Sequence, residues 1–213
     1  TETTKERSVK KRKLCGTDVT AYLLLLIGLF LICLVGMGIQ PYLMAYMQQM
    51  DYTTAFAAGI VSAVLAVNTA AKIISGYVFD RVGSRRTIWI TTGTMACSLL
   101  ILLLFGKGSW IAYAFVIVFA FAYVALSIPA PFLTKEMFGA EYFTELYSIV
   151  MIVTSVGGAV GNVLTGLLYE ASNSYLFVWE CYILLTAIAA AAMLGAFSVK
   201  NKRMGKNESS DCR

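Results

Sequence analysis

The sequence has 213 residues, of which 59% are hydrophobic and 14% are charged, and its mean hydropathy is +0.74. A soluble domain carries about 25% charged residues, so this composition excludes an ordinary soluble domain. The formal net charge is +5 at pH 7.

Six apolar segments dominate the chain, at residues 21–46, 56–79, 87–105, 110–132, 147–169 and 175–199. Each is long enough for an α-helix to cross a bilayer, which takes about 17–25 residues. The sequence therefore predicts an all-α integral membrane protein with a six-helix transmembrane bundle over residues 19–199. Residues 1–18 are expected to form a basic cytoplasmic leader, and residues 200–213 a cytoplasmic tail without regular structure. Because the chain begins at Thr1, we expect it to be part of a longer product.

The basic residues gather in the leader, in the turn between the second and third segments, and in the tail, whereas the opposite loops hold only Lys107. The positive-inside rule then places both termini in the cytoplasm. This distribution explains the positive charge without nucleic-acid binding. A bacterial inner membrane is the expected location, with a eukaryotic membrane as the alternative.

The chain offers few residues for metal or cofactor chemistry. It has no histidine, its five cysteines show no paired spacing, and no segment holds a pair of acidic residues. Imidazole ligands and relays are therefore absent from this chain. We expect no cofactor, no metal site and no enzymatic activity.

The first segment contains Gln40-Pro41-Tyr42 in its outer part. A proline inside a helix removes one backbone hydrogen bond, so a bend or break is expected there. In lipid the freed carbonyl must find a partner or face a wet cavity, so Gln40, Tyr42 and Tyr46 are candidates to line a pathway. For Tyr46, an aromatic belt at the outer interface is an equally good interpretation.

Lys72 is the charged residue that lies deepest in any apolar segment. A lysine at such depth costs roughly 2.5–3.5 kcal/mol on insertion scales and is by default a functional-site hypothesis. The nearest acid in the segment, Asp80, lies eight residues later, about 12 Å along a helix. We expect the partner of Lys72 to be a bound anion, water, or an acid from outside this chain. The alternative is that the long side chain extends to the cytoplasmic interface.

Two later segments carry local signals. The run Ser127-Ile-Pro129-Ala-Pro131 is expected to end or kink the fourth segment at the cytoplasmic face. In the fifth segment Gly157 and Gly161 are four residues apart, the spacing that lets membrane helices approach closely. We expect packing within the chain, with homodimerisation as the less favoured use.

Residues 76–86 read GYVFDRVGSRR and fall between the second and third segments on the cytoplasmic side. This run resembles the G-x-x-x-D-R-x-G-R-R/K signature of the major facilitator superfamily, with Ser84 at a position where a basic residue is also found. The resemblance implies a cytoplasmic gate, a charged latch that must open during transport. Its residues are Gly76, Asp80, Arg81, Gly83, Arg85 and Arg86. The alternative is that the arginines serve only as topology determinants.

Members of this superfamily usually have twelve helices in two six-helix halves, each a 3+3 inverted repeat. The resemblance therefore implies that this chain is the C-terminal half, that its leader is like the central loop, and that its partner is an N-terminal six-helix half.

Residues 68–76 resemble the eighth helix of monocarboxylate and oxalate–formate carriers, N-x-x-G-R-x-x-x-G, and residues 138–175 resemble their tenth-to-twelfth helix region. Lys72 stands where these carriers have arginine, and Asn162 and Glu170 stand where proline and aspartate are usual. Thr154 stands where the oxalate–formate branch has a second cation. One fixed positive charge suits one carboxylate better than two.

The expected function is secondary active transport of small organic anions, monocarboxylates foremost, by alternating access. The candidate substrate-binding residues are Lys72, Asn68, Tyr42, Gln40 and Thr154. Uniport, antiport and proton symport are all open. The alternative function is a half-size membrane protein that does not transport and acts as a sensor or assembly partner.

Overall fold

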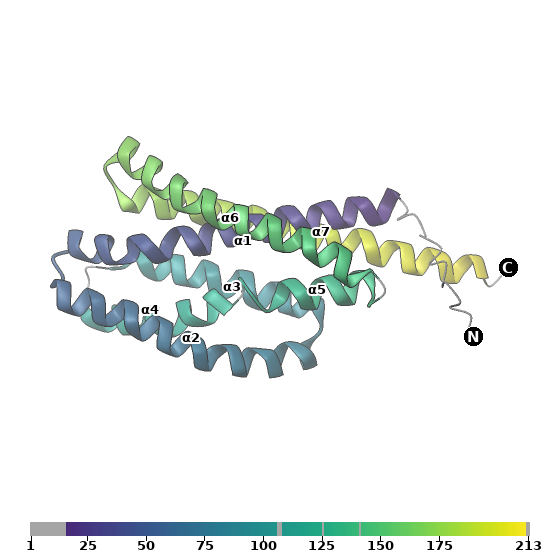
Figure 1. Ribbon diagram of the computed structural model, residues 1–213, viewed down its shortest axis with the longest axis horizontal. Coiled ribbons are helices and arrows are strands. Elements are labelled where there is room, and N and C mark those ends of the chain that lie inside the picture. Colours follow the sequence, from purple (N-terminus) through teal and green to yellow (C-terminus); the bar gives the residue numbers. More distant parts are fainter. Residues whose placement is uncertain (1–15, 106–107, 125, 141, 212–213) are drawn as a thin grey trace, which may run out of the picture.

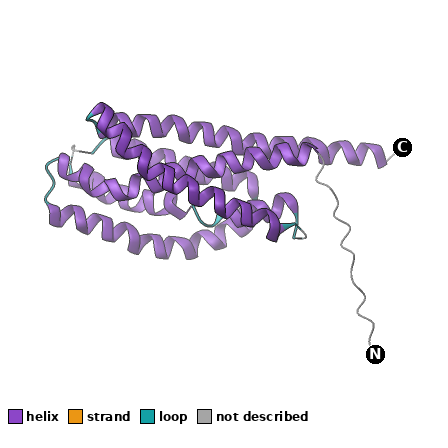
Figure 2. Ribbon diagram, turned by 45° about the horizontal axis from the view of Figure 1, so that its top comes forward, coloured by secondary structure: helices purple, strands orange, loops and turns teal. Residues whose placement is uncertain are grey.

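The computed structural model describes residues 16–105, 108–124, 126–140 and 142–211, and this part of the chain contains α-helices and no strand (Figures 1 and 2). The helices are α1 (Gly16–Gln49), α2 (Thr54–Val82), α3 (Ser84–Leu103), α4 (Ser109–Val124), α5 (Pro129–Phe138), α6 (Phe143–Ser172) and α7 (Tyr175–Asp211). Within the described residues, six helical segments are long and apolar enough to cross a membrane, and α4 and α5 together make the fourth. The predicted six-helix membrane fold is confirmed.

The packing of the helices shows an internal repeat. α1 packs mainly on α6 and α7, α4 packs on α2 and α3, and α3 also packs on α7. Exchanging α1 with α4, α2 with α6, and α3 with α7 turns the α1–α6 contact into the α2–α4 contact and the α1–α7 contact into the α3–α4 contact, and it leaves the α3–α7 contact unchanged. Corresponding helices are three crossings apart and so run in opposite directions, which makes the bundle a 3+3 inverted repeat.

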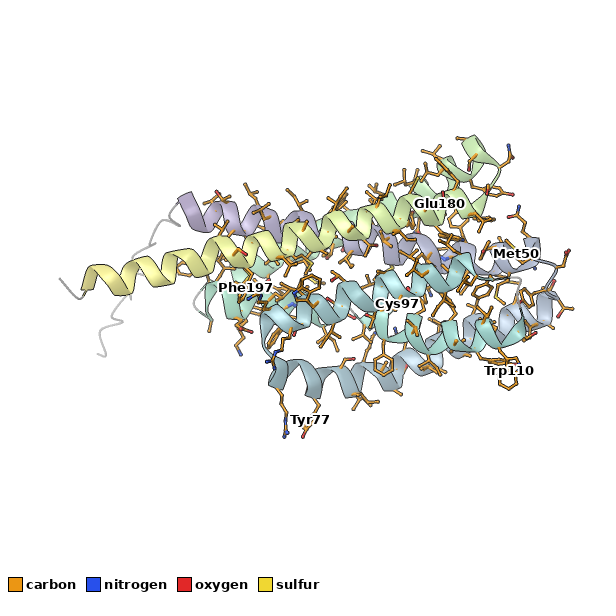
Figure 3. All side chains as sticks on the ribbon, turned by 180° about the vertical axis from the view of Figure 1, so that it is seen from behind. Met50, Tyr77, Cys97, Trp110, Glu180 and Phe197 are labelled. Carbon is orange, nitrogen blue, oxygen red and sulfur yellow. The ribbon has the colours of Figure 1, made fainter. Side chains whose placement is uncertain are left out.

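A cluster of aromatic side chains holds α1, α3 and α7 together at the end of the bundle where α1 and α3 end and α7 begins. Tyr46 is fully buried, its hydroxyl donates to the Leu102 carbonyl at 2.6 Å, and its ring lies 5.5 Å from that of Trp179. A buried aromatic ring with a bonded polar tip is a stable core group. Tyr46 therefore belongs to the core, and both interpretations of it, as a pathway residue or as part of an aromatic belt, were wrong. The exposed Trp110, at the start of α4, projects outward instead (Figure 3).

Glycines allow α1 and α6 to cross with their backbones in contact. A Cβ atom on Gly157 would lie 2.7 Å from the Phe30 carbonyl oxygen, and one on Gly161 would overlap the Leu34 carbonyl oxygen. The prediction that this spacing serves packing within the chain is confirmed.

The fourth segment is broken between α4 and α5. α4 ends at Val124 and α5 begins at Pro129, because Pro129 and Pro131 lack the N–H groups that would continue the helix. The break falls at the predicted residues. Its predicted position at the cytoplasmic face was wrong, since α5 continues for 10 residues to Phe138 and the whole segment spans Ser109–Phe138.

Two other local predictions need correction. Of the bend or break predicted at Pro41, the break is absent, because Pro41 lies inside α1 and the helix continues to Gln49. The tail was expected to lack regular structure, but α7 continues to Asp211. Of the predicted leader, residues 16–18 begin α1, and residues 1–15 lie outside the described part of the chain.

Candidate functional site

Lys72 lies on the flank of the packed face of α2. The buried residues of this helix recur every three or four positions and form one stripe, made of Ala57, Ile60, Val64, Asn68, Ala71 and Ser75. Lys72 follows Ala71 and is therefore turned about 100° from it. Its side chain is exposed and has no hydrogen bond or ion pair with any residue that the structure describes. Lys72 is ten residues before the end of α2 at Val82, about 15 Å along the axis.

The exposed face beside Lys72 carries both polar and apolar side chains. Ser62 and Thr69 lie on this face and are exposed, and they share it with the exposed Leu65 and Ile73. Polar side chains inside a membrane protein normally face protein or water rather than lipid. This face of α2 is therefore suited to a pathway or a partner.

Asn68 joins α2 to α4. Its side chain is 5% exposed, and Nδ2 donates to the Ala120 carbonyl at 3.3 Å. One turn later, Ala71 packs on Val124, with Phe121 and Ile128 around them. Lys72 thus lies on α2 directly next to the residue that packs against the α4–α5 break.

Gln40 and Tyr42 connect α1 to two different helices. The Gln40 Oε1 atom accepts a 2.6 Å hydrogen bond from the Tyr123 hydroxyl on α4. The Tyr42 hydroxyl donates to the Asn162 carbonyl on α6 at 3.2 Å. Both side chains are half-buried. The polar atoms that were predicted to line a pathway also hold α1 in place.

Thr154 lines a cavity of about 230 Å³ between α1, the α4–α5 break and α6. The lining residues are Cys33, Met37, Leu126, Ser127, Ala130, Tyr147, Met151, Thr154 and Ser155. The Thr154 hydroxyl donates to the Val150 carbonyl of its own helix at 2.9 Å, a bond that satisfies a hydroxyl inside a membrane helix.

The five predicted binding residues do not form one cluster. Thr154 lines the cavity, whereas Lys72, Asn68, Gln40 and Tyr42 do not. Sequence reasoning missed the other cavity residues because they come from three separate elements and meet only through packing. Of these cavity residues, only Ser127 could have been singled out from the sequence, because it lies just before Pro129, the first proline of the predicted kink.

The predicted gate residues lie at the turn between α2 and α3. Gly83 separates the two helices with φ 80° and ψ 158°, a conformation that is essentially restricted to glycine. The Arg81 guanidinium lies over the Tyr77 ring, 4.2 Å from its centroid, and Tyr77 projects away from the bundle (Figure 3).

Arg85 and Arg86 are exposed in the first turn of α3. Cations at a helix N-terminus oppose the helix dipole, so these arginines do not serve helix stability. Gly76 is half-buried on α2, and a Cβ atom there would meet open space. The side chain of Asp80 lies outside the described part of the structure.

Among the residues that the structure describes, no three His, Cys, Asp or Glu side chains lie together where they could hold a metal ion. The described residues offer one unpaired cation on α2, a basic turn between α2 and α3, and an uncharged cavity beside a helix break.

Comparison with protein families identifies the chain's relatives. The family model of the Major Facilitator Superfamily matches residues 25–211. No curated protein sequence gives a significant match. The match covers most of the chain and agrees with the six-helix fold and the inverted repeat. The chain therefore belongs to the major facilitator superfamily, a family of membrane transporters rather than enzymes.

Proposed function

We propose that this chain is the C-terminal six-helix half of a secondary transporter that carries small organic anions, monocarboxylates foremost, by alternating access. The observation that supports the proposal most is Lys72. Its ammonium group is exposed at about 15 Å from the cytoplasmic end of α2 and has no partner among the described residues.

An unpaired cation at this depth is unfavourable unless an anion or water reaches it. A transported carboxylate supplies that charge during each cycle and leaves again. Lysine pairs with it as a point charge. We propose that the polar groups of Gln40, Tyr42 and Thr154 are neutral members of the same pathway. Asn68 is proposed to position α2 beside the pathway through its bond to the Ala120 carbonyl, and the charged turn at 80–86 to form the cytoplasmic gate.

The surface of α6 supports a partner half or a wet pathway. One exposed stripe carries Ser148, Ser155 and Asn162 together with Met151, whereas the neighbouring exposed stripe, about 100° around the helix, is mainly apolar. The apolar side chains are Ile149, Ile152, Val156, Val160, Val163 and Leu167. The apolar face suits lipid, and the polar face does not. We propose that an N-terminal six-helix half lies over the polar faces of α6 and α2.

The test is uptake of labelled lactate, formate and oxalate into proteoliposomes that contain the full-length protein. We expect saturable monocarboxylate uptake that Lys72→Gln reduces to background and Lys72→Arg partly restores. Lys135→Gln is the matched control, because Lys135 is an exposed lysine of α5 outside the proposed pathway. If Lys72→Gln leaves uptake unchanged, Lys72 does not bind substrate, and its side chain extends to the cytoplasmic interface instead.

The alternative function is a non-transporting half-size protein that acts as a sensor or assembly partner. It would be supported if the protein, reconstituted with or without an N-terminal half, takes up none of the three anions. We further propose that the protein resides in a bacterial inner membrane with both termini in the cytoplasm.

A further inference from the structure

The break between α4 and α5 leaves a backbone carbonyl group without a hydrogen bond. In an uninterrupted helix the Ser127 carbonyl would accept from the N–H group of residue 131, but Pro131 has none. No residue that the structure describes donates to the Ser127 carbonyl instead. Ser127 lies eleven residues before the end of α5 at Phe138, about 16 Å along the axis. A free carbonyl at this depth needs a partner from outside the helix.

Ser127 lines the cavity between α1, the α4–α5 break and α6, and the other oxygen atoms around this cavity are acceptors or are unpaired. The hydroxyls of Thr154 and Ser155 donate their protons to carbonyls of their own helix, so only their lone pairs remain available. The hydroxyls of Ser127 and Tyr147 form no hydrogen bond with the described residues. The lining therefore offers more acceptors than donors, which favours a cation over an anion.

The two helix ends at the break favour a cation as well. α4 ends at Val124, and the C-terminal end of a helix carries a partial negative charge. The N-terminal end of α5 would favour an anion through its first N–H groups. Two of its first four residues, Pro129 and Pro131, have no N–H group to offer.

The neutral lining indicates which cation fits. None of the residues around the cavity is Asp, Glu, His, Lys or Arg, so the lining has no acid to carry a proton. Proteins hold divalent cations largely through carboxylates, and this lining has none. Carbonyl groups freed at broken membrane helices coordinate sodium ions in transporters. The volume of about 230 Å³ equals that of roughly seven water molecules at ~30 Å³ each, enough for a sodium ion with part of its hydration shell.

We infer that this cavity binds a sodium ion through the Ser127 carbonyl and the hydroxyl oxygen atoms of Ser127, Tyr147, Thr154 and Ser155. The ion is cargo that crosses the membrane together with the carboxylate, not a resident metal. This sodium symport rests on the proposed function and adds its coupling ion, whereas the binding of sodium does not depend on which anion is carried. One sodium ion and one monocarboxylate cross together without net charge.

The first experiment measures sodium binding without transport. The unfolding midpoint of the full-length protein in detergent is followed while sodium chloride replaces choline chloride at constant ionic strength. A ligand that binds only the folded state raises its stability, so the midpoint should rise with sodium. Thr154→Val and Ser127→Ala each remove one oxygen atom, and we expect each to raise the dissociation constant fitted to this rise about tenfold or more.

Thr94→Val in α3 is the matched control. Its half-buried hydroxyl donates to the Ile90 carbonyl at 2.9 Å, as that of Thr154 donates to the Val150 carbonyl at 2.9 Å. Thr94 does not line the cavity, so the dissociation constant should stay within about twofold of wild type. A midpoint that rises equally with sodium, potassium and choline would show that the cavity holds water only and would overturn the site. Equal loss of sodium binding in Thr94→Val and Thr154→Val would overturn it too.

The second experiment tests the coupling. Lactate uptake into proteoliposomes is compared under inward gradients of sodium, potassium and protons at the same membrane potential. We expect the sodium gradient alone to accelerate uptake, and Thr154→Val to require more sodium for the same acceleration. Uptake that ignores the sodium gradient would overturn sodium symport.

The sodium site and the proposed function fail separately. If sodium raises the unfolding midpoint but no tested anion is taken up, the proposed function fails and the sodium site stands. If anions are taken up but neither the midpoint nor the uptake responds to sodium, only the sodium inference fails.

Discussion

Single polar residues in this bundle divide into those that bond across helices and those that do not. Asn68, Gln40 and Tyr42 each form a hydrogen bond to a neighbouring helix. Lys72 forms none with the described residues. Leaving an ammonium group unpaired inside a membrane protein costs far more free energy than leaving an amide unpaired. Of these four residues, Lys72 is therefore the one whose position the contacts within the bundle do not explain.

Asn68 provides a test of this division. Asn68→Ala removes the bond from Nδ2 to the Ala120 carbonyl, and hydrogen bonds between membrane helices contribute about 0.6 kcal/mol on average and up to about 1.7. We therefore expect a lower midpoint of thermal unfolding in detergent, and a KM for lactate within about twofold of wild type.

Ser198→Ala is the control for Asn68→Ala, because the Ser198 hydroxyl on α7 is exposed and bonds only to the Leu194 carbonyl of its own helix. A rise in KM without loss of thermal stability in Asn68→Ala would instead show that the amide contacts substrate.

At the scale of helices, the crossing of α1 and α6 depends on glycine. Gly161→Ala places a methyl group against the Leu34 backbone carbonyl, which cannot move without shifting α1. Overpacking of this kind costs typically 1–3 kcal/mol. We expect a clear fall in the unfolding midpoint and reduced yield of folded protein, measured by size-exclusion chromatography after heating.

Gly93→Ala in α3 is the matched control, because a Cβ atom there meets nothing within 4 Å. Alanine is favoured over glycine in a helix by about 1 kcal/mol, so this variant should be as stable as wild type or more stable. Equal destabilisation by both substitutions would show that the α1–α6 crossing is looser than the structure indicates.

The helices could be predicted from the sequence because the length of each apolar run is read directly from consecutive residues. The α4–α5 break could also be predicted from the local sequence, since two prolines mark it. Its depth in the membrane could not, because it depends on the continuation of α5, which packs Leu133 and Met137 into the core. Pro41 failed to break α1 for a related reason: the helix is held on both sides by α6 and α7. The cavity could not be predicted, since Cys33, Ser127 and Ser155 meet only in the folded bundle.

The whole molecule has two kinds of surface. The outer faces of α3 and α7 are apolar, with exposed Trp89, Leu100, Leu184 and Ile188. The exposed polar faces lie on α2 and α6. A six-helix unit in lipid would leave those polar faces poorly solvated, which is why the proposed function assigns them to a partner half and a pathway.

The orientation of the molecule yields the last prediction. Arg81, Arg85 and Arg86 mark the α2–α3 turn as cytoplasmic by the positive-inside rule, and the inverted repeat then places the α5–α6 turn on the same side. Ser109 is exposed at the start of α4, on the opposite side, and Ala140 is exposed in the α5–α6 turn.

In intact cells, a charged maleimide should label Ser109→Cys directly and Ala140→Cys only after the membrane is permeabilised, with the native cysteines replaced by serine. Restoring Cys97 alone gives the control, because it is exposed in the middle of α3, where lipid excludes a charged reagent. Labelling of Ala140→Cys from outside the cell would reverse the orientation and would place the charged α2–α3 turn, and with it the proposed gate, on the outer face.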